Sequence, residues 1–138
     1  MGADAKTAVP ALVKVLQDSP QEIRLRAIDS LADLGATAKA AVPDLRNALK
    51  DSDEKVREAA AKALGSIGVH AKAAVPDLIN ALNDPSESVR VQTINALPNL
   101  GSEAKTAIPE LTPALSDSSR SVRLAAIAAI CAGPLASR

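Results

Sequence analysis

The sequence predicts an all-α protein, an α-solenoid (superhelix) made of four tandem 33-residue helix pairs. Four glycines, Gly2, Gly35, Gly68 and Gly101, stand 33 residues apart, and each is followed by Ala, Lys, Pro and Leu at fixed offsets. Self-similarity at this period is the signature of a repeat architecture. The chain also contains no Phe, Tyr or Trp. Its core must therefore consist of Leu, Ile, Val and Ala, which suits closely packed helices.

The repeat divides the chain into units that each hold two similar phrases. The first phrases read GADAKTAVPAL, GATAKAAVPDL, GVHAKAAVPDL and GSEAKTAIPEL, and the second read QDSPQEIRLRAIDSL, KDSDEKVREAAAKAL, NDPSESVRVQTINAL and SDSSRSVRLAAIAAI. We expect a single domain over residues 1–138, with units at 2–34, 35–67, 68–100 and 101–133. Residues 134–138 then begin a truncated unit or form a tail.

The first helix of each unit is predicted to start near a recurrent proline. Proline lacks an amide hydrogen and fits the first helical turn, so the Ala-Lys-Ala-Ala before it should form a kinked or separate turn. These prolines are Pro10, Pro43, Pro76 and Pro109. In the second unit, Val42, Leu45, Ala48 and Leu49 then fall on one helix face.

The second helix follows a polar turn, residues 50–54 in the second unit. Val56, Ala60, Ala63, Leu64 and Ile67 form its apolar stripe, and an Asp or Ser of the turn can cap it. The glycine that opens the next unit matches the left-handed residue that ends a helix.

Two departures from the repeat, Pro98 and Pro113, predict a kink or an early stop in their helices. A lone helix pair cannot bury both of its apolar stripes, so the units must stack into a short curved rod.

The repeat phrase resembles the HEAT family, in particular its short bacterial form, similar to the repeats of phycobilin lyase subunits. The resemblance lies in residues 56–65, VREAAAKALG, in Asp51 six positions before Arg57, and in the AVPDL of residues 41–45. Tetratricopeptide units need aromatic residues and ankyrin units need a Thr-Pro-Leu-His phrase, and both features are missing. The resemblance implies a non-catalytic scaffold for a protein partner. The alternative is a bilin lyase-like or chaperone-like subunit that cradles a chromophore-bearing protein.

One aspartate and one arginine recur in every unit. A charged binding track is one interpretation. We favour a structural ladder, as in HEAT arrays resembling this chain, in which each aspartate caps a helix start and accepts hydrogen bonds from an arginine of the same or the adjacent unit. Its members are Asp18, Asp51, Asp84, Asp117, Arg24, Arg57, Arg90 and Arg123. A lysine row is interpreted as solubilising, with a basic stripe for an acidic partner as the alternative: Lys6, Lys39, Lys72 and Lys105.

The exposed face of the second helices is the predicted partner-binding surface, because HEAT-like arrays usually bind there and its residues differ between units. Unconstrained drift would give the same variation. The candidate residues are Leu25, Arg26, Asp29, Glu58, Lys62, Val91, Gln92, Asn95, Leu124 and Ala128.

Composition argues against several other functions. Sixteen basic and sixteen acidic residues cancel, which removes the field that supplies non-specific DNA affinity or membrane-surface attraction, and base-stacking aromatics are lacking. Nucleic-acid and membrane partners are therefore not expected.

His70 and Cys131 are single residues of their types, so we predict no metal site, cofactor or catalytic residue. His70 is expected in an exposed turn and Cys131 as a small packing residue. The single cysteine fits a reducing, cytoplasmic location.

Both terminal units are apolar where solenoid ends are usually polar. The first helix carries Val9, Leu12, Val13 and Leu16, and residues 122–131 are apolar on every side beyond Arg123. Two explanations stand: the chain is an excerpt of a longer array, which we favour, or its ends meet other copies or a partner. End-to-end self-association is thus a possible partner mode.

Overall fold

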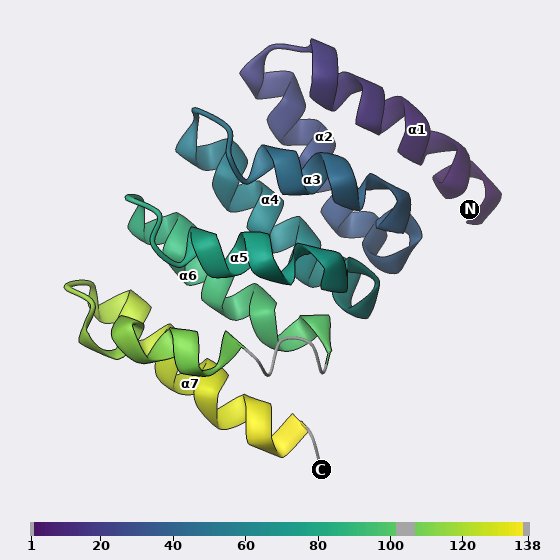
Figure 1. Ribbon diagram of the computed structural model, residues 1–138. Coiled ribbons are helices and arrows are strands. Elements are labelled where there is room, and N and C mark those ends of the chain that lie inside the picture. Colours follow the sequence, from purple (N-terminus) through teal and green to yellow (C-terminus); the bar gives the residue numbers. More distant parts are fainter. Residues whose placement is uncertain (1, 102–106, 137–138) are drawn as a thin grey trace.

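The computed structural model describes residues 2–101 and 107–136, with side chains over residues 7–101 and 107–131. Every element in these ranges is helical, which confirms the predicted class (Figure 1). The α-helices are α1 Gly2–Asp18, α2 Gln21–Leu34, α3 Val42–Ala48, α4 Glu54–Ile67, α5 Val75–Ala81, α6 Glu87–Ala96 and α7 Arg120–Ala136. The 3₁₀ helices are η1 Gly35–Ala41, η2 Gly68–Ala74, η3 Leu97–Leu100 and η5 Pro109–Ser116.

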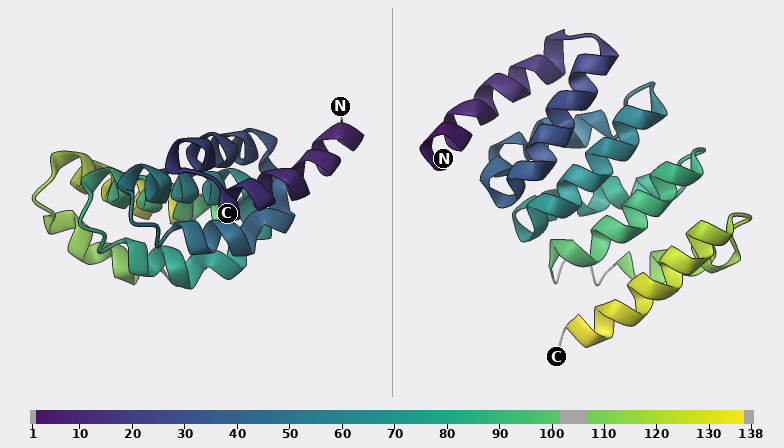
Figure 2. Two further views of the ribbon diagram at one scale, coloured as in Figure 1. Left: turned by 90° about the horizontal axis from the view of Figure 1, so that it is seen from above. Right: turned by 180° about the vertical axis from the view of Figure 1, so that it is seen from behind.

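The helices form two layers of a solenoid. One layer holds the first helices α1, α3 and α5 with η5, and the other holds the second helices α2, α4, α6 and α7 (Figure 2). Successive second helices pack directly on one another, α2 on α4, α4 on α6 and α6 on α7. This stacking lets each unit bury the stripes that it cannot bury alone.

A single core runs the length of the molecule between the layers. It is one connected cluster that extends from Val9 in α1 to Ala129 in α7. Alanine is the most frequent residue of this cluster, while leucine and isoleucine supply most of the largest fully buried side chains. Leu31, Leu64 and Leu97 are at most 1% exposed at equivalent positions. The four buried alanines of α4 are small enough to let α2 and α6 approach closely on either side: Ala59, Ala60, Ala61 and Ala63.

The repeated proline starts a helix in the two middle units. Pro43 and Pro76 lie in the first turns of α3 and α5, directly after η1 and η2. The Ala-Lys-Ala-Ala segment therefore forms the separate turn predicted from the sequence. Helix α1 differs, because it continues as α-helix through Pro10.

Pro98 and Pro113 both interrupt α-helix, as predicted. Helix α6 ends at Ala96, and Pro98 lies in the following 3₁₀ helix η3. Pro113 lies inside η5, which takes the place of an α-helix in the fourth unit.

The boundary glycines have the positive φ expected of them: φ is 55° at Gly35, 73° at Gly68 and 90° at Gly101. Their ψ values of −133°, −136° and −160° differ from those of a left-handed helix, however. They fall near the extended, positive-φ region that essentially only glycine adopts.

Candidate protein-interaction surface

The predicted binding residues lie on the outer side of the second helices. Six are exposed, namely Arg26, Asp29, Lys62, Asn95, Leu124 and Ala128. The remaining four, Leu25, Glu58, Val91 and Gln92, are half-buried. Leu25 and Val91 also pack against the core cluster, so they serve the fold as well as the surface.

A hollow of about 160 Å³ opens on this surface between α4 and α6. Its lining is mostly polar: Lys62, Gly65, Ser66, Gln92, Asn95, Ala96 and Asn99. We call it the α4–α6 hollow. It brings together three predicted residues, Lys62, Gln92 and Asn95. Ser66 and Asn99 are additions that the repeat pattern did not reveal, because they lie near the end of the unit, outside the phrases that carry the repeat.

The floor of the hollow is set by a close approach of two helices. A Cβ atom on Gly65 would lie 3.0 Å from both Cα and Cβ of Ala96. Only glycine leaves room for this approach, and small residues on both sides keep the floor open. Around it, the carboxamides of Gln92, Asn95 and Asn99 can each donate and accept hydrogen bonds, as a peptide backbone does.

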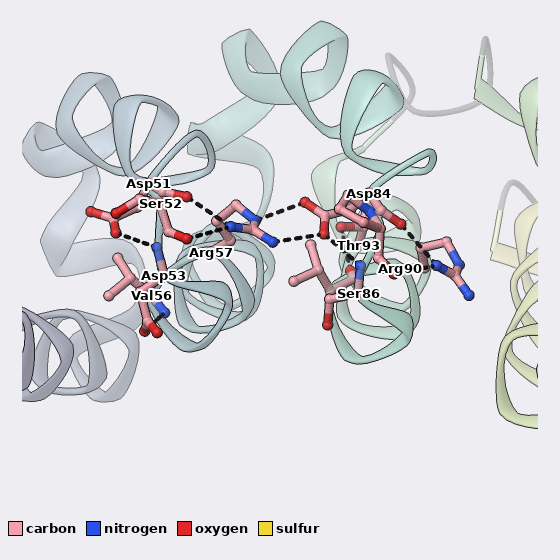
Figure 3. Close-up of polar contacts among 11 residues, drawn as sticks. Asp51, Ser52, Asp53, Val56, Arg57, Asp84, Ser86, Arg90 and Thr93 are labelled. Atoms are coloured by element: carbon pink, nitrogen blue, oxygen red, sulfur yellow. Dashed lines mark hydrogen bonds and ion pairs between the residues drawn. The ribbon is translucent and has the colours of Figure 1, made fainter.

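The ladder residues join successive units at the turns that precede the second helices (Figure 3). Arg57 forms a bidentate pair with Asp84, with Nε 2.8 Å from Oδ2 and Nη2 3.1 Å from Oδ1. Its Nη1 also donates to the carbonyls of Asp51 and Ser52 in its own unit, at 2.8 and 3.2 Å. One guanidinium therefore binds two consecutive turns at once.

The other two junctions repeat this arrangement with poorer geometry. Arg90 Nη2 donates to Asp117 Oδ1 at 3.2 Å. Arg90 Nε lies 3.0 Å from Asp117 Oδ2 but is not aimed at it well enough for a hydrogen bond. Arg24 makes one contact, Nη1 to Asp51 Oδ2 at 3.1 Å, and its buried Nε has no partner in the described part of the chain.

Each junction aspartate also shapes its own turn. Oδ1 of Asp51, Asp84 and Asp117 accepts a hydrogen bond from the amide two residues later, at 2.8 to 2.9 Å. The prediction that these aspartates cap the helix starts is therefore wrong: at the start of α4 the cap is Asp53, which accepts from the Val56 amide, and the side chain at the start of α6, Ser86, makes no cap hydrogen bond. The hydrogen bond from the Ser119 amide, aided by Arg90, holds the pKa of Asp117 below its ordinary value, although burial acts in the opposite direction.

The two outer ladder residues are placed differently. Asp18 is exposed, and no ion pair or hydrogen bond joins its carboxylate to the described residues. Arg123 donates through Nη1 to the carbonyls of Asp117 and Ser118, at 2.7 and 3.2 Å, but reaches no carboxylate among the described residues. The ladder thus joins three internal pairs and leaves one residue over at either end.

A second set of contacts between units, on the first helices, was not predicted. Arg46 Nε lies 2.6 Å from Asp77 Oδ2, and Gln17 Nε2 donates to Asp44 Oδ1 at 3.1 Å. The recurrence of Asp44, Asp77 and Glu110 in register was the available signal.

The remaining predicted residues are on the surface. Lys39, Lys72 and His70 are exposed, whereas the side chain of Lys6 and the whole of Lys105 lie outside the described residues. Cys131 is exposed, so its interpretation as a packing residue is wrong. Its counterpart Gly65 is covered by α6, whereas no described helix packs over Cys131.

Within the described residues, His, Cys, Asp and Glu form no group of three that could hold a metal ion. Nor is any helix of that part long and apolar enough to cross a membrane.

Comparison with protein families gives a decisive match. A model described as HEAT repeats matches residues 9–79 and 75–132. The chain belongs to the HEAT-repeat family. No curated protein sequence matches it significantly.

Three solved structures have a similar fold. A designed armadillo repeat protein in complex with the peptide (KR)4 matches with a TM-score of 0.74 at 24% identity, covering 89% of this chain and 64% of that one. The complex of CpcE and CpcF of phycocyanin lyase from Nostoc sp. PCC7120 matches with a TM-score of 0.71 at 28% identity, covering 94% and 55%. An archaeal HEAT-like repeats protein from Thermococcus onnurineus NA1 matches with a TM-score of 0.59 at 18% identity, covering 98% and 61%. The chain thus spans less than two thirds of each of these proteins.

Proposed function

We propose that this HEAT-repeat protein is a non-catalytic scaffold that binds an extended segment of a protein partner across its second helices. The α4–α6 hollow is the observation that carries this proposal. Its carboxamides can replace the water that hydrates a peptide backbone, and Lys62 and Ser66 add donors at the rim. The exposed residues on either side of the hollow differ from unit to unit, so the surface can distinguish one partner sequence from another.

The designed armadillo repeat protein supports the mode of binding. It has a similar fold and is in complex with a peptide. A stack of helices presents a long continuous surface, which suits an extended ligand better than a compact one. The single cysteine supports a cytoplasmic site of action.

Selection from a displayed peptide library, followed by calorimetric titration of the selected peptide, tests the proposal. We expect Asn95→Ala to weaken binding about tenfold, because a hydrogen bond that serves the ligand contributes roughly 1 to 1.5 kcal/mol. Asn80→Ala is the matched control, since Asn80 is also exposed but lies on α5 in the other layer. Equal losses for both variants, or none for Asn95→Ala, would place the binding site elsewhere.

The similarity to the CpcE–CpcF complex supports a second candidate function, a bilin lyase-like or chaperone-like subunit that cradles a chromophore-bearing protein. Incubation with a bilin, followed by gel filtration and absorbance, separates the two functions. Pigment retained by the protein supports the lyase-like role. Pigment that elutes apart from it supports the scaffold alone.

A further inference from the structure

Equivalent hollows lie at two junctions between units, beside the turns that precede the second helices. The hollow between the first and second units has a volume of about 280 Å³, and the one between the third and fourth units has about 410 Å³. We call the larger one the third-junction hollow. Shifted by two whole repeats, most lining residues of the smaller hollow coincide with those of the larger, among them Gln17 with Asn83 and Asp44 with Glu110.

At the first two junctions, a carboxylate of the later unit accepts a hydrogen bond from the unit before it. Gln17 Nε2 donates to Asp44 Oδ1 at 3.1 Å across the smaller hollow. At the second junction, Arg46 Nε donates to Asp77 Oδ2 at 2.6 Å. Asp44 and Asp77 occupy the same position of the repeat, so this position ordinarily faces a donor of the preceding unit.

Glu110 occupies this position in the fourth unit and has lost its donor. Ile79 stands where Arg46 stands two units earlier in the series of first helices, one repeat before it, and Asn83 stands in the place of the longer Gln17. No ion pair or hydrogen bond joins the Glu110 carboxylate to the described residues. Because the donors of this position come from the preceding unit, which the chain contains, the lack follows from Ile79 and Asn83 themselves.

The charges around the third-junction hollow leave one negative charge unbalanced. Asp84 is paired with Arg57, and Asp117 is paired with Arg90. Arg90 also donates through Nη1 to two backbone carbonyls, and its Nε is buried. The guanidinium is therefore occupied, and Glu110 remains as a carboxylate that favours a cationic ligand.

The rest of the lining suits the side chain of arginine. Leu82, Pro85 and Pro113 provide apolar surface for its methylene stem, and Asn83 and Ser118 add side-chain oxygens that can accept hydrogen bonds. The guanidinium is a planar fork of five N–H donors that matches a carboxylate. A volume of about 410 Å³ also falls within the range of about 300 to 1,000 Å³ that ligand sites have.

We propose that the third-junction hollow binds an arginine side chain of a protein partner, with its guanidinium paired to Glu110. The ligand supplies the cation that Arg46 supplies to Asp77 one junction earlier. Free arginine would bring a carboxylate as well, and the described residues of the hollow offer it no unoccupied cation, which favours an arginine within a protein chain. The proposal goes beyond the proposed function, because this hollow lies at the turn before α6 and the α4–α6 hollow lies further along that helix.

Titration of the whole protein with N-acetyl-L-arginine amide, followed by amide chemical shifts, tests this site separately from the α4–α6 hollow. The amides of Asn83, Ala114 and Ser118 should shift and saturate. The corresponding citrulline amide has nearly the same shape without the charge and should cause no saturable shift, and the lysine amide should bind several times more weakly because it lacks the planar fork. Glu110→Gln should weaken binding of the arginine amide about tenfold, whereas Glu22→Gln, the same change at an exposed position of α2, should leave it unchanged.

Ile79→Arg provides a second test, because it places a cation where Arg46 has one. It should abolish binding of the arginine amide while the circular dichroism stays that of the parent protein. Should this variant fail to fold, Asn83→Gln at an exposed position restores the residue length of Gln17 and should weaken binding severalfold. The absence of a saturable shift at the hollow would overturn the proposal. So would equal binding of the citrulline or lysine amide, or binding that Glu110→Gln leaves unchanged.

Discussion

The second and fourth units begin from nearly the same phrase and fold differently. In the second unit, Asp44-Leu45-Arg46-Asn47 continues as α-helix α3, whereas Glu110-Leu111-Thr112-Pro113 of the fourth lies in the 3₁₀ helix η5. Pro113 occupies the position of Asn47 and Asn80. A proline there removes an amide hydrogen from the helix interior and clashes with the preceding turn.

The neighbouring units differ as well. The Arg57–Asp84 pair after the second unit is bidentate and well aligned, whereas Arg90 reaches Asp117 with poorer geometry. A hollow of about 410 Å³, lined in part by Arg90 and Pro113, lies at that later junction. The comparison teaches that the repeat fixes the path of the chain, while single residues decide how tightly each junction closes.

Arg57→Ala should break the tight junction and have the largest effect. It removes four hydrogen bonds and leaves Asp84, whose side chain is 8% exposed, without its cation. We expect a loss of about 2 to 3 kcal/mol in the free energy of unfolding, measured by urea titration. The matched control is Arg123→Ala, which removes only bonds to carbonyls and should cost about 1 kcal/mol. Equal losses would show that the pairing with aspartate contributes nothing.

Gly65→Ala should also destabilise the second unit, although alanine is the better helix former. The helical preference favours alanine by roughly 1 kcal/mol. The new methyl would lie 3.0 Å from the Ala96 backbone, however, and that backbone cannot move away cheaply. We expect a net loss of about 1 kcal/mol in the free energy of unfolding, from the strain of overpacking. A gain in thermal stability would show that α4 and α6 can separate freely.

Pro113→Asn should make the fourth unit resemble the second. Asparagine restores the amide donor and permits α-helix over residues 109–116. We expect a gain of about 1 kcal/mol in the free energy of unfolding and a stronger helical circular dichroism signal. Pro109→Asn is the control, because a proline at the start of the element causes little loss. An unchanged dichroism signal for Pro113→Asn would mean that packing, rather than Pro113, sets the 3₁₀ geometry.

The smallest effect concerns pH at the weaker junction. Because the pKa of Asp117 is lowered in the folded protein, its ionised form stabilises the fold above its unfolded pKa. That contribution is lost as pH falls through the folded value. Asp117→Asn should therefore lose stability at neutral pH and show a shallower decline in acid than the parent protein. Urea titrations at neutral pH and in mild acid measure this. Parallel declines for the two proteins would contradict the assignment.

The sequence predicted the solenoid well because its main signals are covalent and local. The period of 33 residues can be read directly from the sequence. The helix-starting prolines and the boundary glycines determine the backbone conformation only within a few residues of themselves. The sequence left open whether each aspartate pairs with an arginine of its own unit or of the adjacent unit. The pairing of Arg57 with Asp84 of the next unit depends on how the units stack.

The α4–α6 hollow was only partly predictable. Lys62, Gln92 and Asn95 followed from helix periodicity, which places them on the outer face. Gly65 and Asn99 join them because α4 and α6 approach closely, and that distance depends on tertiary packing rather than on any local pattern. The prediction that Cys131 is a packing residue was wrong for the same reason. The burial of its side chain depends on a neighbouring helix and not on its own size.

Mapping a selected peptide onto the protein by amide chemical shifts tests the central claim most directly. The amides of Lys62, Ser66, Gln92 and Asn95 should shift on titration, while those of α3 and α5 on the other layer stay in place. Shifts concentrated on α3 and α5, with the α4–α6 hollow unchanged, would contradict the assignment of the second helices as the binding surface.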